Sequence, residues 1–181
     1  MDSKGNIAIL RMGDVQEGEI LFDNVGFVDV VDSGLLLQPG DLVFNRTNSL
    51  DQIGKVGLFK GNSDYPVSFA SYLVRLRCTP KITPEFLNRL LNSTQVLAWA
   101  RSEALPAIGQ ANLNPNRYSF LRIALPPLNE QLDIVEFLKS ETKKLDDLKS
   151  ATERTINLLK ERRTALISAA VTGQLAIGTE S

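Results

Sequence analysis

The chain of 181 residues contains no histidine and a single cysteine, Cys78. Without histidine, it lacks the commonest general base and the commonest side-chain metal ligand. One cysteine allows neither an intrachain disulfide nor a cluster of thiolate metal ligands. The sequence also has no apolar run of membrane-spanning length and no apolar stretch typical of a signal peptide near its N-terminus. These absences predict a cytoplasmic protein with no membrane partner, and they exclude many classes of enzyme.

Motifs of enzymes that act on nucleic acids are also missing. The sequence has no G-x-x-x-x-G-K-[ST] phosphate loop and, after its predicted strands, no acidic pair followed by lysine as metal-dependent nucleases need. Residues 114–118 read N-P-N-R-Y, which superficially resembles the N-P-P-Y motif of amino-methyltransferases, but Asn116 and Arg117 replace the second proline and shift the aromatic residue. No glycine-rich cofactor loop precedes this segment. The chain is therefore predicted to be non-catalytic, with no metal site and no cofactor.

The net charge of −1 conceals a strong internal asymmetry. Residues 1–41 hold two basic and eight acidic side chains, whereas residues 42–127 hold ten basic and four acidic ones. In residues 128–181, eight basic and nine acidic side chains are interspersed. The positive middle region suits a phosphate backbone as partner. The alternative is that its lysines and arginines scatter over all faces of the domain.

Periodicity and punctuation predict an α+β globular domain over residues 1–127, with a mixed or curved β-sheet and short helices. Thr83 and Pro84 mark the N-terminus of a helix, as an N-cap followed by proline at the first helical position. A second helix is expected from about residue 94 to 101. The expected strands are 35–37, 42–44, 56–59 and 120–125, with a β-rich run at 67–76. Short strands in 6–31 are broken by Gly13, Gly18 and Gly26, and polar loops are expected at 45–52 and 109–119.

Residues 128–181 are predicted to form a spacer region for pairing and subunit binding, with a long helix from about residue 129 to 172. Pro126 and Pro127 stop the preceding segment, and Asn129 is the expected N-cap of a helix about 65 Å long. Apolar residues recur every seven positions, which favours a partner helix along this seam. The alternative is an amphipathic helix that packs on its own domain. The predicted helix-pairing residues are Leu138, Leu145, Leu148, Thr152, Ile156, Leu159 and Leu166.

Two polar segments are candidate DNA contacts. The first, 45–49, follows an apolar strand and combines arginine, amide and hydroxyl side chains that suit base edges or phosphates. The second, 109–118, is rich in amides, and its Asn116 and Arg117 are the expected phosphate contacts, whereas Gln110, Asn112 and Asn114 are expected to be structural. On composition alone an ordinary polar turn is favoured over a DNA contact for the first segment, and the second is compatible with turns or with amides that cap a neighbouring helix. The predicted contacts are Arg46, Thr47, Asn48, Ser49, Lys55, Lys60, Asn116 and Arg117.

Several strings resemble the specificity (S) subunit of type I restriction–modification systems. They are L-P-P-L-N-E-Q at 125–131, F-L at 137–138 and I-N-L-L-K-E-R-R-T-A-L-I-S-A-A-V-T-G at 156–173, preceded by L-R-M-G-D at 10–14, P-G-D-L-V-F-N-R-T-N-S at 39–49 and I-G-Q-A-N-L-N at 108–114. In order, they look like a target recognition domain that runs into the family's conserved spacer helix. The resemblance implies a subunit that selects double-stranded DNA and directs a modification (methyltransferase) subunit and a restriction (motor-nuclease) subunit to it.

The chain departs from the family in one respect. Family S subunits usually carry two recognition domains and two spacer helices, whereas this chain has one of each. It also begins almost at L-R-M-G-D, so we expect the opening part of the recognition domain to be missing and the chain to be a half-subunit or a fragment. Its partner is then a second S half, or a second copy as an antiparallel homodimer. The competing hypothesis is a structural coiled-coil adaptor whose globular head binds protein.

Overall fold

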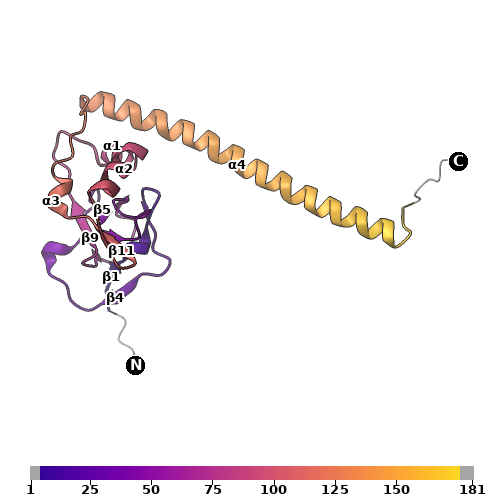
Figure 1. Ribbon diagram of the computed structural model, residues 1–181, viewed down its shortest axis with the longest axis horizontal. Helices are drawn as coiled ribbons and strands as arrows, with labels where there is room; N and C mark the ends of the chain where they lie inside the picture. The colour runs from indigo at the N-terminus through magenta and orange to yellow at the C-terminus, as the bar shows by residue number, and fades with distance from the viewer. Residues whose placement is uncertain (1–4, 176–181) are drawn as a thin grey trace. The chain divides into compact units, whose positions relative to one another are not determined.

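A computed structural model describes residues 5–175 of the chain. It has two compact units, one that ends at Val135 and one that begins at Glu136. The first unit contains small β-sheets and three short helices, and the chain continues into one long helix, α4 (Leu128–Val171; Figure 1). The predicted α+β class with a long C-terminal helix is confirmed. The domain boundary at residue 127 stays a prediction.

Within residues 5–175, the β-structure is divided among four small sheets rather than gathered in one. β1 pairs with β4 in antiparallel and with β8 in parallel orientation, and β5 pairs antiparallel with both β7 and β9. β2 and β3 form a hairpin, and β11 lies between β10 and β6. The strands are β1 (Ile7–Leu10), β2 (Val15–Gln16), β3 (Glu19–Ile20), β4 (Gly26–Val28), β5 (Leu42–Asn45), β6 (Thr47–Asn48), β7 (Val56–Leu58), β8 (Val67–Phe69), β9 (Leu73–Leu76), β10 (Leu105–Ala107) and β11 (Gln110–Asn112).

Strand β5 lies at the centre of this unit, because both of its faces are covered. Leu42 and Phe44 belong to one buried apolar cluster, and Val43 belongs to the other. This explains why its sequence is continuously apolar and does not alternate with polar residues. Phe44 stacks on Tyr118 of α3 (Pro115–Tyr118), with ring centroids 4.6 Å apart. The end of β5 is therefore tightly packed, and the segment that follows it starts from a fixed position.

Helices α1 (Pro84–Leu91) and α2 (Thr94–Glu103) confirm the two predicted short helices. Thr83 caps α1, since its hydroxyl oxygen accepts a hydrogen bond from the backbone nitrogen of Phe86 at 3.4 Å. Ser93 caps α2 in the same way. These boundaries were predictable because a cap and a proline act within one turn of the chain.

Two predicted strands are wrong. Residues 33–35 form a short 3-10 turn that Asp32 caps. Leu37 is buried, and its backbone nitrogen donates a hydrogen bond to the carbonyl of Val67, but it belongs to no strand. Residues 120–125 form no strand, and Phe120 is 72% exposed. Gly26, expected as a break, is the first residue of β4. An apolar run does not make a strand unless another strand is available to pair with it, and sequence pattern alone does not report that partner.

The first turn of α4 is attached to the first unit by a buried glutamine. Gln131 is fully buried; its Oε1 accepts from the backbone nitrogen of Thr83 at 2.9 Å, and its Nε2 donates to the carbonyls of Lys81 (3.0 Å) and Pro126 (2.9 Å). The helix begins at Leu128, so the prediction of Asn129 as its N-cap is wrong. Gln131 links this turn to the segment that enters α1.

Replacing Gln131 with alanine is expected to destabilise the first unit by about 2–4 kcal/mol, because one buried N–H and two carbonyls would lose their partner. Alanine favours a helix more than glutamine does, so helix propensity would oppose this loss. Urea denaturation followed by tryptophan fluorescence would measure the change. The neighbouring exposed residue offers the control, since Glu130→Ala should stay within about 0.5 kcal/mol of the wild type. Equal urea midpoints for the two variants would contradict a stabilising role of the Gln131 hydrogen bonds.

Candidate nucleic-acid interface

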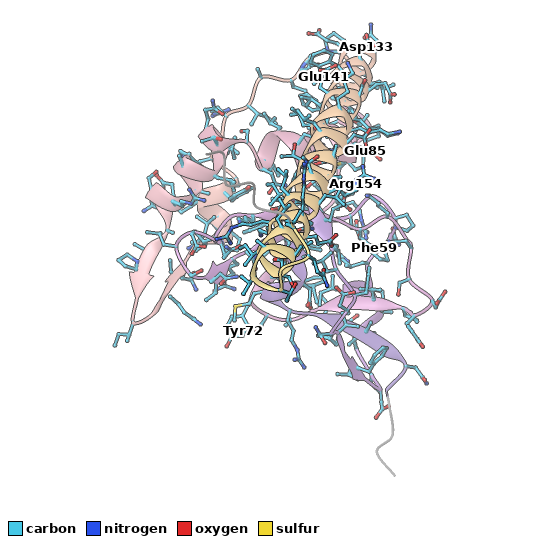
Figure 2. The ribbon with its side chains drawn as sticks, turned by 90° about the vertical axis from the view of Figure 1, so that its right-hand side faces the viewer. Phe59, Tyr72, Glu85, Asp133, Glu141 and Arg154 are labelled. Atoms are coloured by element: carbon cyan, nitrogen blue, oxygen red, sulfur yellow. The ribbon has the colours of Figure 1, made fainter. Side chains whose placement is uncertain are left out.

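The segment 45–49 is not a loop, contrary to the prediction. Asn45 ends β5, and after Arg46 the chain forms β6, which pairs with a different sheet. The backbone of Arg46 is held on both sides, since its nitrogen donates to the carbonyl of Tyr72 at 3.0 Å and its carbonyl accepts from Leu113 at 2.8 Å. Tyr72, labelled in Figure 2, belongs to the turn between β8 and β9. The segment therefore bridges two sheets and has a fixed backbone.

The predicted loop at 109–119 is also regular structure. It comprises β11, the second strand of a hairpin with β10, followed by the short helix α3. β11 pairs with β6 so that Asn112 lies opposite Thr47, and the Asn112 Nδ2 donates to the Thr47 Oγ1 at 3.0 Å. Asn114 caps α3 by accepting from the nitrogen of Asn116. The fold thus brings the two polar segments side by side on paired strands, and Asn112 and Asn114 have the structural roles predicted for them.

Arg46 is half-buried and carries a charge that no described carboxylate neutralises. The ion pairs within residues 5–175 do not include it. Its Nε is buried without a hydrogen-bond partner, as are both amide atoms of the neighbouring Asn45. Buried polar groups in proteins are nearly always paired, so exceptions are informative. The junction between β5 and β6 therefore presents a cation with hydrogen-bonding capacity that the described fold leaves unused.

Lys55 lies on the wall of a cleft beside β6. Its Nζ donates to Gln52 Oε1 at 2.8 Å, and the Gln52 Nε2 donates to Asp51 Oδ2 at 2.7 Å. Hydrogen bonds from Ser49 and Gln52 hold the pKa of Asp51 below its ordinary value, so this carboxyl stays ionised and keeps Gln52 oriented. The ammonium group of Lys55 is thereby positioned by a hydrogen bond to its neighbour Gln52.

The cleft itself has a volume of about 450 Å³ and was not foreseen from the sequence. Asn48, Gln52 and Lys55 line one side, and the β2–β3 hairpin supplies the other through Gln16 and Glu17. Most of the residues that line the cleft carry an amide, an ammonium or a carboxylate group. Side chains of these kinds can form hydrogen bonds with base edges. One local signal was present: the pair Glu17-Gly18 between two short strands is the position of a hairpin turn.

The remaining predicted contacts lie outside the lining of this cleft. Lys60 pairs with Glu19 at 2.7 Å, and Arg117 pairs with Glu103 at 2.8 Å. Asn116 is exposed on α3. Ion pairs at such exposed positions contribute only about 0–1 kcal/mol, so a phosphate group could displace the carboxylates at small cost. Ser49 is half-buried directly after β6, where its nitrogen donates to Asn48 Oδ1.

Part of the positive charge of residues 42–127 is neutralised inside the fold. Arg77 forms a two-pronged ion pair with the buried carboxylate of Asp41, at 2.6 and 2.7 Å. Burial alone would raise the pKa of Asp41, but hydrogen bonds from Arg77 and from the backbone of Gln38 outweigh it and lower the pKa. Arg77 is therefore a structural cation. Arg46 and Lys55 are the sequence-predicted cations near the β6–β11 pair that belong to no ion pair within residues 5–175.

Helix α4 displays the predicted heptad residues as an exposed apolar stripe. Leu145 is 65% exposed and Leu159 is 58% exposed. Charged side chains such as Glu141 and Arg154 project from the same helix (Figure 2). Thr152 donates its hydroxyl to the carbonyl of Leu148 at 2.8 Å, which satisfies that group within the helix. In the part of the chain that the structure describes, no helix is both long and apolar enough to span a membrane.

Comparison with known proteins finds relatives that resemble most of this chain. No protein-family model matches the chain. It is 26% identical over 165 residues to the putative type I restriction enzyme MjaX specificity subunit of Methanocaldococcus jannaschii, and 25% identical over 171 residues to the type I restriction enzyme EcoKI specificity subunit of Escherichia coli K12. These matches cover 88% and 92% of the chain. The chain is a homologue of type I restriction enzyme specificity subunits.

This specificity-subunit homologue spans about 37% of the length of the curated relatives that it matches. Its fold agrees with a chain from a solved type I R-M system, with a TM-score of 0.71 over 94% of this chain and 39% of that one, at 18% identity. The matched part corresponds in size to one recognition domain with one helix. The resemblance inferred from L-P-P-L-N-E-Q and the strings around it is confirmed.

Proposed function

We propose that this specificity-subunit homologue is a DNA sequence-recognition component, which directs separate methyltransferase and motor-nuclease subunits to its target and catalyses no reaction itself. The observation that carries the proposal is the pairing of β6 with β11. This pairing joins the two polar segments into one rigid surface, with Arg46 and Lys55 beside it. The similarity to named specificity subunits supports the same role.

Recognition by this surface would combine base contacts with phosphate contacts. The guanidinium of Arg46 can donate two parallel hydrogen bonds to the O6 and N7 atoms of guanine, and the amide of Asn48 can pair with adenine. Thr47 and Ser49 offer hydroxyls for phosphates or bases. Phosphate contacts would come from Lys60, Arg117 and Asn116, once DNA displaces the two surface carboxylates. The fixed backbone of β6 would then set the register of all these groups on the duplex.

Helix α4 would supply the subunit contacts of the same assembly. Its exposed heptad stripe fits a second long helix, either from another specificity half or from a second copy in antiparallel orientation. The modification subunits would bind the pair of helices, and the restriction subunit would join them. The chain and its partners would act at double-stranded DNA in the cytoplasm.

Substitution of Arg46 tests this proposal. In the complex with the modification subunit, Arg46→Ala should lose about 1–3 kcal/mol of discrimination at one base position, since a good bidentate pair contributes that much. Arg46→Lys should restore charge but only part of the discrimination, because lysine lacks the planar fork. Binding would be measured on target and scrambled duplexes over a range of salt concentrations.

The matched control is Arg122→Ala, which removes the same charge from an exposed position of the first unit. It should weaken both duplexes slightly and equally. Equal losses on both duplexes for Arg46→Ala would assign Arg46 to the phosphate backbone. A wild-type complex that does not distinguish target from scrambled DNA would favour the protein-binding adaptor.

A further inference from the structure

The cleft beside β6 has two walls of opposite hydrogen-bonding character. On one wall, Lys55 is a cation, and Asn48 uses its Oδ1 to accept from Ser49, which leaves the Nδ2 as a donor. From the β2–β3 hairpin, Gln16 uses its Nε2 to donate to the carbonyl of Gly13 at 2.9 Å, which leaves its oxygen as an acceptor, and Glu17 adds a carboxylate to the lining. The lining of this cleft of about 450 Å³ therefore combines donors from one segment with acceptors from another.

The two charges of the cleft are not neutralised by an ion pair in the described part of the chain. Within residues 5–175, neither Glu17 nor Lys55 belongs to an ion pair, although both side chains line this cleft and also a second one of about 340 Å³ next to Asn88 and Asn92. Opposite charges that share a cleft without contacting each other can be satisfied together by a ligand that presents both an acceptor and a donor between them.

The backbone at Glu17 is in an unfavourable conformation for this residue type. Its φ is 49°, and among the non-glycine residues of 5–175 Glu17 alone has a positive φ. Gly18 follows with a φ of 87°. Together they form the two-residue turn of the β2–β3 hairpin, where asparagine, aspartate and glycine are preferred. Residues held in such conformations cluster at functional sites. A glutamate at this position indicates that its side chain, rather than its backbone preference, is what the site needs.

The turn is also held rigidly, as a base-reading group must be. The carbonyl of Gly18 accepts from Asn88 Nδ2 of α1 at 2.9 Å and from the backbone nitrogen of Leu58 of β7 at 3.1 Å. A Cβ on Gly18 would lie 3.1 Å from the Asn88 amide, so the approach between the turn and α1 is close. The position of Glu17 is thus set by contacts with a helix and a strand.

We propose that Glu17 and Lys55 together read one G·C base pair in the major groove. Glu17 accepts from the N4 amino group of cytosine, and Lys55 donates to the O6 and N7 atoms of the paired guanine, which lie next to that amino group. This assignment rests on the proposed function and replaces the phosphate role that the sequence suggested for Lys55. The reading residue that the sequence analysis missed is Glu17.

The test is the substitution Glu17→Gln in the complex with the modification subunit. Binding would be measured on a set of duplexes in which each target position is changed in turn. Loss of the carboxylate should reduce discrimination about 5- to 150-fold at one G·C position and leave the other positions unchanged. Affinity for scrambled DNA should rise or stay equal, because removal of a negative charge reduces repulsion from phosphates.

A second variant separates base reading from a general charge effect. Lys55→Met should relax the same base pair as Glu17→Gln, and the double variant should lose less than the sum of the two, since both contact one pair. Glu19→Gln, on the same hairpin, is the control for lost charge and should leave base preference unchanged. Glu17→Asn should raise the thermal midpoint, because asparagine suits the turn, while it relaxes the same position.

The outcomes distinguish this inference from the function on which it rests. A wild-type complex that discriminates among the duplexes, with Glu17→Gln and Lys55→Met unchanged at every position, would overturn the G·C contact and leave the proposed function standing. Equal tightening of target and scrambled DNA by Glu17→Gln would also overturn it, since that result requires only a charge. A wild-type complex without any discrimination would overturn the proposed function itself.

Discussion

The double substitution Leu145→Glu and Leu159→Glu is expected to abolish self-association of the chain in solution. Both leucines are more than half exposed on α4, and burial of each in a partner helix would contribute about 1.5–3 kcal/mol. A carboxylate in their place would have to be buried unpaired, which costs more than the leucine contributes. Sedimentation should show a pair of chains for the wild type at micromolar concentration and single chains for the variant.

The matched control adds the same two charges to the opposite side of the helix. Ser150→Glu and Asn157→Glu lie at heptad positions that face away from the stripe, so this variant should associate like the wild type. Circular dichroism should show an intact first unit in both variants. A wild type that is monomeric at micromolar concentration would contradict self-association, and a monomeric control would show that charge, not the stripe, decides the state.

Local signals explain which parts of the fold could be predicted from the sequence. The heptad leucines of α4 and the caps of α1 act within one or two turns, so their patterns report the structure directly. The central strand β5 was recognisable because three successive apolar residues lie between polar ones. The family strings were useful for a different reason, since they record similarity to known proteins and not physical preference.

The candidate site was only partly predictable, because its geometry depends on pairing between distant segments. Thr47 and Asn112 are far apart in sequence, and neither carries a sign that it will face the other across two strands. Polar composition made both segments resemble loops, whereas β6 and β11 satisfy each other's backbone. Glu17 was missed for a similar reason: an acidic residue in an acidic stretch is unremarkable until the fold brings it into the same cleft as Lys55.

Gln131 shows how a motif can be recognised while its physical role stays hidden. The sequence contains L-P-P-L-N-E-Q, yet the prediction assigned the start of α4 to Asn129, on cap chemistry alone. In the structure, the glutamine satisfies the backbone at Lys81, Thr83 and Pro126, which belong to segments distant in sequence or to the proline stop itself. A buried amide with three partners cannot be inferred from one helix, since its partners lie elsewhere in the chain.

Deletion of one heptad from α4 is expected to shorten the gap in the DNA target. Removal of Thr152–Leu158 places Leu145 seven residues from Leu159, so the leucine stripe continues while the helix loses about 10 Å, at 1.5 Å per residue. If two copies pair antiparallel, their two-fold symmetry predicts an interrupted palindrome as the target. The gap between its half-sites should fall by about three base pairs, at 3.4 Å per step.

Sequencing of methylated sites in cells that carry the deletion with its modification subunit would read the new gap directly. The half-site sequences should stay the same, because the deletion lies outside the surface formed by β6 and β11. A five-residue deletion is the control: it turns the helix by about 500°, which places the following stripe about 140° out of line and should abolish pairing instead of shortening the gap. An unchanged gap would show that α4 does not set the spacing. A target without two-fold symmetry would show that the chain works beside a different second half.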